Sequence, residues 1–99
     1  MELIFEWDQK KADQNRKSHT VSFEEAKTVF NDPLLITYPD EFHSDYEERL
    51  LSIGTSAQRR VLLVIHTEQE QEDDSVLIRV ISARKAMASE RKAYEEDQN

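Results

Sequence analysis

The chain has 99 residues, 37% of them hydrophobic, which is enough for one modest core, and we expect a single domain over residues 1–99. The lack of cysteine excludes disulfides and thiolate catalysis, while the absence of a secretory signal or a long apolar run predicts a cytoplasmic protein that does not bind membranes. A formal net charge of −8 argues against non-specific binding to nucleic acid by the surface as a whole.

The first third of the sequence predicts one strand and two helices. Asp8 is suited to cap a polar, cation-rich first helix. Ser22 and Glu25 have the spacing of a capping box at the start of a second helix, which Pro33 ends. The predicted elements are a strand at 3–7, a helix at 9–17 and a helix from 23 to about 30.

The remainder predicts four strands and a closing helix. Residues 47–53 alternate in polarity, so an extended chain would place Glu47 and Arg49 on one face. Residues 61–67 are apolar on both faces, as expected of a central strand. The predicted elements are strands at 34–38, 47–53, 61–67 and 76–82, turns at 54–58 and 68–74, and a helix at 88–97.

This order, β-α-α-β-β-β-β-α, predicts an α+β fold. Connections of hairpin length join the later strands, which favours a small antiparallel sheet. We expect the helices to pack on one face of that sheet.

The acidity is concentrated in two short stretches without cations. Residues 68–74 carry five carboxylates and residues 95–97 carry three, so the rest of the chain is neutral. Ten of the thirteen cationic side chains occur as adjacent pairs, so a basic face is compatible with the net charge.

Two arginines near the C-terminus are the first candidates for contact with phosphate. Arg79 lies in the predicted last strand, and Arg84 follows at its junction with the last helix. A strand arginine needs a carboxylate partner, an anionic ligand or access to solvent. For Arg79, a buried ion pair with Glu47 and a phosphate contact both remain open.

The candidates for proton transfer are Glu47, His43 and His19. Glu47 and Arg49 suit a base and a phosphate clamp, or members of an ion-pair ladder with Arg79. A histidine can act as acid or base near neutral pH, but in a loop it also serves as a surface or turn residue. Three scattered histidines and an acidic run without the spacing of a calcium loop predict no metal site and no cofactor.

Motifs along nearly the whole chain resemble the BrnT family of bacterial type II toxins. The most extensive of these motifs are Phe5-Glu6-Trp7-Asp8, Val21-Ser22-Phe23-Glu24-Glu25-Ala26, Asp40-x-x-His43-Ser44-x-x-Glu47-x-Arg49, Ile78-Arg79-Val80-Ile81-Ser82-Ala83-Arg84-Lys85-Ala86 and Glu90-Arg91-x-x-Tyr94-Glu95-Glu96. The resemblance implies a fold similar to RelE-type toxins and a metal-independent endoribonuclease that halts translation. It also implies neutralisation by a BrnA-like antitoxin, DNA contact only through that complex, and an assembly compatible with a dimer of toxin–antitoxin heterodimers.

The chain departs from the family pattern where cations are expected. Ser18-His19-Thr20 stands where the family usually shows Lys-His-Gly, and Gln69 occupies a place where arginine is common. Met87 replaces the usual threonine before the last helix. Fewer cations near a phosphate site weaken transition-state stabilisation. The alternative hypothesis is therefore a catalytically weak or inactive homologue that acts as an antitoxin-binding module.

Overall fold

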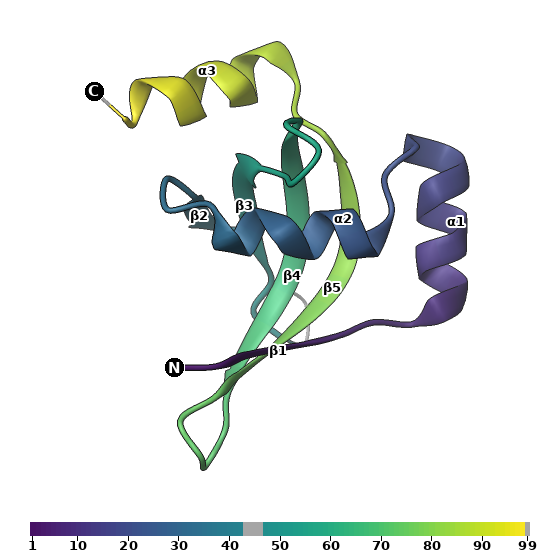
Figure 1. Ribbon diagram of the computed structural model, residues 1–99, viewed down its shortest axis with the longest axis vertical. Coiled ribbons are helices and arrows are strands. Elements are labelled where there is room, and N and C mark those ends of the chain that lie inside the picture. The colour runs from purple at the N-terminus through teal and green to yellow at the C-terminus, as the bar shows by residue number, and fades with distance from the viewer. Residues whose placement is uncertain (43–46, 99) are drawn as a thin grey trace.

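The computed structural model describes residues 1–42 and 47–98, and within them a five-stranded sheet has the order β1-β5-β4-β3-β2 (Figure 1). Strands β2 to β5 pair antiparallel, whereas β1 runs parallel to β5. The predicted α+β class is confirmed, and the one departure from an antiparallel sheet is β1. The strands are β1 (Leu3–Glu6), β2 (Ile36–Pro39), β3 (Leu50–Thr55), β4 (Val61–Glu70) and β5 (Val76–Lys85).

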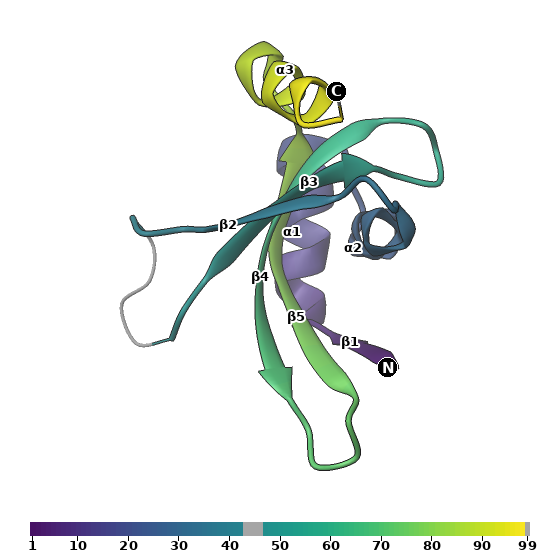
Figure 2. The same cartoon turned by 90° about the vertical axis from the view of Figure 1, so that its left-hand side faces the viewer.

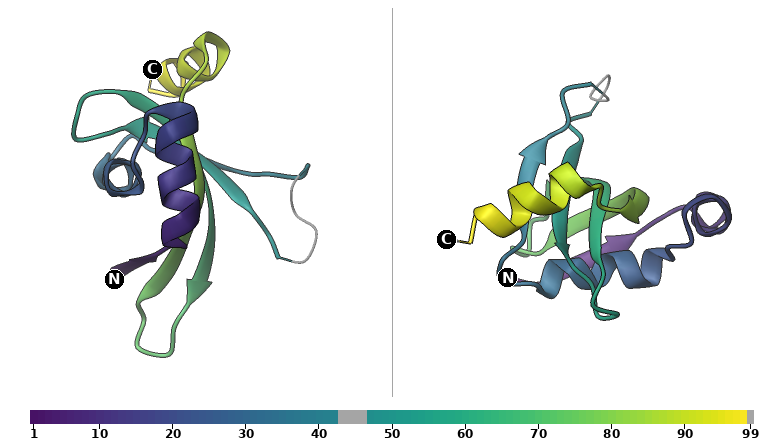
Figure 3. Two further views of the ribbon diagram at one scale, coloured as in Figure 1. Left: turned by 90° about the vertical axis from the view of Figure 1, so that its right-hand side faces the viewer. Right: turned by 90° about the horizontal axis from the view of Figure 1, so that it is seen from above.

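Helices cover both faces of the sheet. The helical elements are α1 (Gln9–His19), α2 (Phe23–Lys27), the 3₁₀ turn η1 (Thr28–Asn31) and α3 (Ala88–Glu96). In Figures 1 and 2, α2 crosses one face, α1 lies beside β5, and α3 lies across the end of the sheet opposite the β4–β5 hairpin. In the right-hand panel of Figure 3, which shows the molecule from above, the strands lie between α3 and α2.

Two hydrophobic clusters explain why one covered face is not enough. Leu62 and Val64 of β4 belong to the cluster under α1 and α2, whereas Leu63 packs on the other face with Tyr94 of α3. Because successive residues of a strand point to opposite faces, a strand that is apolar throughout needs cover on both. The prediction that the helices share one face is therefore wrong for α3.

A bulge in β5 sets the direction of its arginines. Ile65 pairs with Ser82 and His66 with Val80, so Ile81 is an extra residue. Arg84 pairs with Leu63 and Arg79 with Thr67, and both β4 partners point to the face that carries α3. Arg79 and Arg84 consequently share a face, although they are five positions apart.

A partly buried ion pair joins α1, α2 and the β3–β4 turn. Glu25 accepts hydrogen bonds from the Arg60 guanidinium, including one from Nε at 2.9 Å, and from Ser56 Oγ at 2.7 Å. The Arg60 contact is the main cause that keeps the pKa of Glu25 below its usual range. Ser22 Oγ caps α2 by accepting from the Glu25 N–H at 3.0 Å, but the Glu25 carboxylate turns to Arg60. Only this half of the predicted capping box is therefore observed.

Thr20 ends α1 in the left-handed region, with φ 58° and ψ 26°. Its N–H donates to Arg16 O at 2.9 Å, and its own carbonyl accepts from Arg60 Nη2 at 3.2 Å. This backbone conformation favours glycine, which the family pattern has here, and costs about 1–2 kcal/mol for other residues. Threonine in place of glycine at position 20 therefore affects how α1 ends, and it removes no side chain that could act in a site.

A polar cluster attaches α3 to the sheet. The Tyr94 hydroxyl donates to Asp32 Oδ2 at 2.5 Å and lies 3.0 Å from Thr55 Oγ1, while Asp32 also accepts from the Thr55 N–H at 2.8 Å. Burial opposes ionisation of Asp32, but these hydrogen bonds outweigh it and lower the pKa of the carboxyl. Tyr94 is only 5% exposed, so it is a core residue and its ring is not available to stack on a base.

His66 is fully buried beneath α2 and η1. Its Nε2 lies 2.7 Å from Ser52 Oγ, which in turn is 2.8 Å from Thr37 Oγ1, and its ring meets Phe30 edge-on. Nδ1 has no hydrogen-bond partner. Burial lowers the pKa of His66 from 6.5 to about 4, so this histidine is neutral at pH 7.

His66 should make the protein less stable in mild acid. Its pKa is lower in the folded chain, so the unfolded chain binds more protons between pH 6.5 and 4, and the free energy of unfolding falls by about 3 kcal/mol across that interval. Urea unfolding at several pH values measures this slope. His66→Gln should remove it between pH 7 and 5, above the range where carboxylates titrate; equal slopes in the two proteins would contradict the prediction.

No helix within the described residues is long and apolar enough to cross a membrane.

Candidate functional site

Asn15 fixes α1 against the part of β5 that β1 does not cover. β1 pairs only with residues 76–79, which leaves the following backbone open at that edge. The Asn15 side chain accepts from the Ala83 N–H at 3.1 Å and donates to the Ala83 carbonyl at 2.8 Å. It also donates to Val21 O at 3.0 Å. One buried amide thus takes the place of a neighbouring strand and holds the C-terminal turn of α1 beside the end of β5.

A surface depression lies between these two ends. It has a volume of about 420 Å³ and contains the candidate residues His19 and Arg84 together with Lys85. His19 is the last residue of α1 and is exposed. The lining residues are Ser18, His19, Thr20, Arg84, Lys85 and Met87. The fold therefore brings a histidine and an arginine to one depression from segments 65 residues apart, an arrangement suited to an anion and a proton-transfer step. Lys85 also lines the depression, but it pairs with Leu62 whereas Arg84 pairs with Leu63, so the two cationic side chains leave β5 on opposite faces.

Arg84 is held by a carboxylate from α3. Its Nη1 donates to Glu90 Oε1 at 2.7 Å, and its Nη2 donates to Glu90 Oε2 at 2.8 Å. Glu90 Oε1 also accepts from the Met87 N–H at 2.7 Å, so the carboxylate caps α3 without the threonine expected there. The hydrogen bonds with Glu90 raise the pKa of Arg84, and those with Arg84 lower the pKa of Glu90.

Arg79 lies apart from this depression. It is exposed, and no hydrogen bond or ion pair of its side chain is present in the described part of the chain. Its strand neighbours are Glu6 on β1 and Thr67 on β4. Arg79 is five positions before Arg84 on β5 and does not line the depression, so the structure does not bring the two arginines into one site.

Of the two alternatives for Arg79, the buried ion pair with Glu47 is not observed among the described residues. β3 begins at Leu50, so Glu47 lies outside the strand on an exposed bend, and β4 separates β3 from β5. Alternation over 47–53 does not distinguish a strand from the loop that leads into it. Arg49 is half-buried, and its carbonyl accepts from the Asp40 N–H at 2.8 Å. His43 falls outside the described residues.

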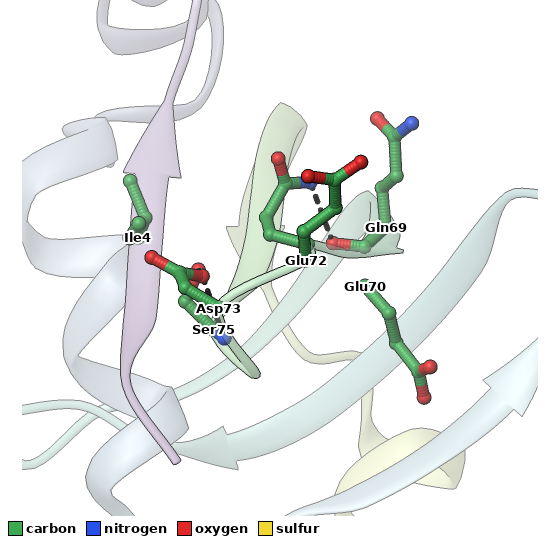
Figure 4. A pocket seen from close by; sticks show the side chains of 7 residues that line it. Ile4, Gln69, Glu70, Glu72, Asp73 and Ser75 are labelled. Carbon is green, nitrogen blue, oxygen red and sulfur yellow. Dashed lines mark hydrogen bonds between the residues drawn. The ribbon is translucent and has the colours of Figure 1, made fainter.

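A second depression, of about 630 Å³, has the opposite charge. It lies at the β4–β5 hairpin, where Glu70, Glu72 and Asp73 surround it (Figure 4). Ser75 donates its hydroxyl to Asp73 at 2.6 Å and thereby lowers the pKa of that carboxyl. Carboxylates repel a phosphate backbone, so this hairpin does not suit RNA. In the described part of the chain no three His, Asp or Glu side chains are placed to hold a metal ion.

The comparison with protein families decides the identity. A family model described as the ribonuclease toxin BrnT of type II toxin–antitoxin systems matches residues 7–90.

The chain belongs to the BrnT family.

The family expected from the sequence motifs is thus confirmed, although no curated protein is significantly similar in sequence. The fold is similar to the crystal structure of the ribonuclease toxin BrnT from Brucella abortus. That similarity has a TM-score of 0.59 at 21% identity and covers 88% of this chain and 99% of that one.

Sequence reasoning missed three residues of this BrnT-family site. Lys85 and Glu90 lay within quoted motifs, but neither they nor Asn15 were given a role in the site. The spacing of Met87 and Glu90 was a usable signal, because the glutamate of a capping box reaches back towards the helix start, where Arg84 lies. No local pattern indicates that Asn15 bonds to Ala83, 68 positions away.

Replacing Asn15 tests how strongly α1 depends on this contact. Asn15→Asp preserves the shape but loses both donors and sets a carboxylate beside the carbonyls of Val21 and Ala83. We expect it to lower the free energy of unfolding by about 3 kcal/mol, measured by urea denaturation. Gln14→Glu makes the same charge change at the exposed neighbouring position and should cost less than about 0.5 kcal/mol. Similar losses in the two variants would refute the assignment.

Proposed function

We propose that this BrnT-family chain is an endoribonuclease toxin that cleaves RNA without a metal ion and halts translation in the cytoplasm. The observation that carries the proposal is the meeting of His19, Arg84 and Lys85 in one open depression. Membership of a family of ribonuclease toxins supports it independently.

The chemistry requires a base, stabilisation of negative charge and an acid. A base removes the proton of a 2′-hydroxyl, whose oxygen attacks the adjacent phosphorus, and an acid then protonates the departing 5′-oxygen. Arg84 is the cation that we assign to the charge that develops on the phosphorane, and Lys85, on the other face of β5, adds positive charge at the rim. His19 is the histidine that lines the same depression, and a histidine side chain is the commonest general acid or base in enzymes. Arg79 contacts a more distant phosphate, while Glu47, Arg49 and His43 remain candidates for support from the β2–β3 side.

The expected protein partner is a BrnA-like antitoxin that covers the depression. Contact with DNA then belongs to the toxin–antitoxin complex, assembled as a dimer of heterodimers. The charge of this chain supports that division, because a protein with a net charge of −8 has little affinity of its own for a duplex.

One observation favours the second candidate, an antitoxin-binding module without catalysis. Glu90 already occupies both terminal nitrogens of Arg84, and Ser18 stands in place of a lysine at the depression. Such a protein would bind its antitoxin and leave RNA intact. Incubation of purified toxin with total RNA, with and without the antitoxin, separates the two candidates.

The ribonuclease should cleave RNA in the presence of EDTA, and its activity should depend on the side chains that line the depression. We expect His19→Ala to reduce cleavage of an RNA oligonucleotide by about 10²-fold or more, and Arg84→Ala by about 10²–10³-fold. Induced wild-type protein should also arrest bacterial growth. Lys92→Ala is the control for loss of a positive charge, because Lys92 is exposed on α3 and its ion-pair partner among the described residues is the exposed Glu96, at 3.9 Å. Soluble wild-type protein that leaves RNA intact would refute catalysis.

Arg79 should affect RNA affinity without affecting stability. Because it is exposed and has no partner in the described part of the chain, Arg79→Ala should change the free energy of unfolding by less than about 0.5 kcal/mol. If it contacts one phosphate, the slope of log affinity against log salt should decrease by about 0.7. Fluorescence anisotropy with a 2′-O-methyl oligonucleotide measures both affinity and slope. An unchanged slope would exclude Arg79 from the RNA path.

A further inference from the structure

The Arg84 guanidinium has two edges that can each bind an oxyanion through two N–H groups. One edge lies between Nη1 and Nη2, and the other lies between Nε and Nη2. The first is filled by Glu90 at 2.7 and 2.8 Å, and the second hydrogen of Nη1 is directed to the Lys85 carbonyl at 3.2 Å. No residue in the described ranges accepts a hydrogen bond from Nε. Two parallel donors therefore remain on the second edge.

Glu90 is itself fixed in place, so it can hold the guanidinium in one orientation. Its Oε1 accepts from the Met87 N–H as well as from Arg84. One turn further along α3, Tyr94 is bonded to Asp32 and close to Thr55, which ties the helix to η1 and β3. The Arg84 side chain is 31% exposed, and that of Glu90 is 19% exposed. The pair is thus only partly accessible to water, and Arg84 also lines the depression with His19 and Lys85.

We infer that Glu90 is a positioning residue, which holds Arg84 so that its Nε/Nη2 edge receives an RNA phosphate. This role rests on the proposed function and names a residue that acts on the substrate through another. A positioning role also explains why Glu90 can bind both terminal nitrogens of Arg84 in an active enzyme. The Glu90 carboxylate fills the Nη1/Nη2 edge and leaves the Nε/Nη2 edge for phosphate. Because a planar fork loses little freedom on binding when it is already oriented, the pair lowers the cost of gripping the phosphate.

A matched pair of variants separates positioning from mere competition. Glu90→Gln and Glu96→Gln each remove one negative charge from α3, but only Glu90 contacts Arg84. If Glu90 positions Arg84, Glu90→Gln should bind a 2′-O-methyl RNA oligonucleotide about ten-fold more weakly than Glu96→Gln does. If Glu90 only competes with phosphate, Glu90→Gln should bind more tightly than Glu96→Gln, and that result would overturn the inference, as would equal affinities.

A spectroscopic measurement keeps the test valid if Glu90→Gln loosens α3. In the wild-type protein, titration with inorganic phosphate should shift the Arg84 ¹⁵Nε–H resonance in an NMR spectrum, whereas Arg84→Lys, which keeps the charge but lacks the fork, should bind the oligonucleotide about as weakly as Glu90→Gln. An Arg84 Nε–H resonance that phosphate does not move would refute the assignment of this edge. Cleavage is read separately: a wild-type protein that binds the oligonucleotide through Arg84 but leaves RNA intact refutes the proposed nuclease and leaves the positioning role standing.

Discussion

The pairing of one side-chain amide with an open strand edge is the contact on which the geometry of this toxin depends. Without Asn15, the N–H and carbonyl of Ala83 would be unsatisfied at the open edge of β5, and within the described residues the bond from Arg60 to the Thr20 carbonyl would be the polar tie left at the end of α1. With it, the end of α1 is held beside the end of β5, and His19 and Arg84 meet. The site is thus a product of one buried hydrogen-bonding group that takes no part in chemistry.

The distribution of charge explains how an acidic protein can present a depression that is lined by cationic residues. The acidic hairpin lies at the opposite end of the sheet from α3 (Figure 2), in a molecule whose longest dimension is 36 Å, and the depression is lined by residues where β5 leads into α3. At physiological ionic strength, exposed charges are screened over about 8 Å. The hairpin carboxylates therefore contribute little repulsion at the depression, and the net charge of the chain is a poor guide to its local field.

The sequence allowed the architecture to be predicted better than the site. Periodicity located every strand and helix approximately, because Ser22, Pro33 and the apolar run at 61–65 report on local backbone preference and burial. The apolar run at 61–65 also indicates that helices must cover both faces of the sheet, although we expected them on one face only. The site depends on contacts between distant segments, such as Asn15 with Ala83, and local patterns do not specify them. The capping pair of α3 was an exception, since its spacing was visible in the sequence and its link to Arg84 was overlooked.

The extra residue at Ile81 makes the length of β5 as important as its composition. In a regular strand, positions 79 and 84 would point to opposite sides, and the two guanidinium groups would serve different surfaces. Loss of Ile81 alone would leave Arg79 opposite Thr67 and Arg84 opposite Leu63, now four positions apart in a regular strand and still on one face. A homologue that kept the five-residue spacing of the arginines but lacked the bulge would instead carry the second arginine on the opposite surface.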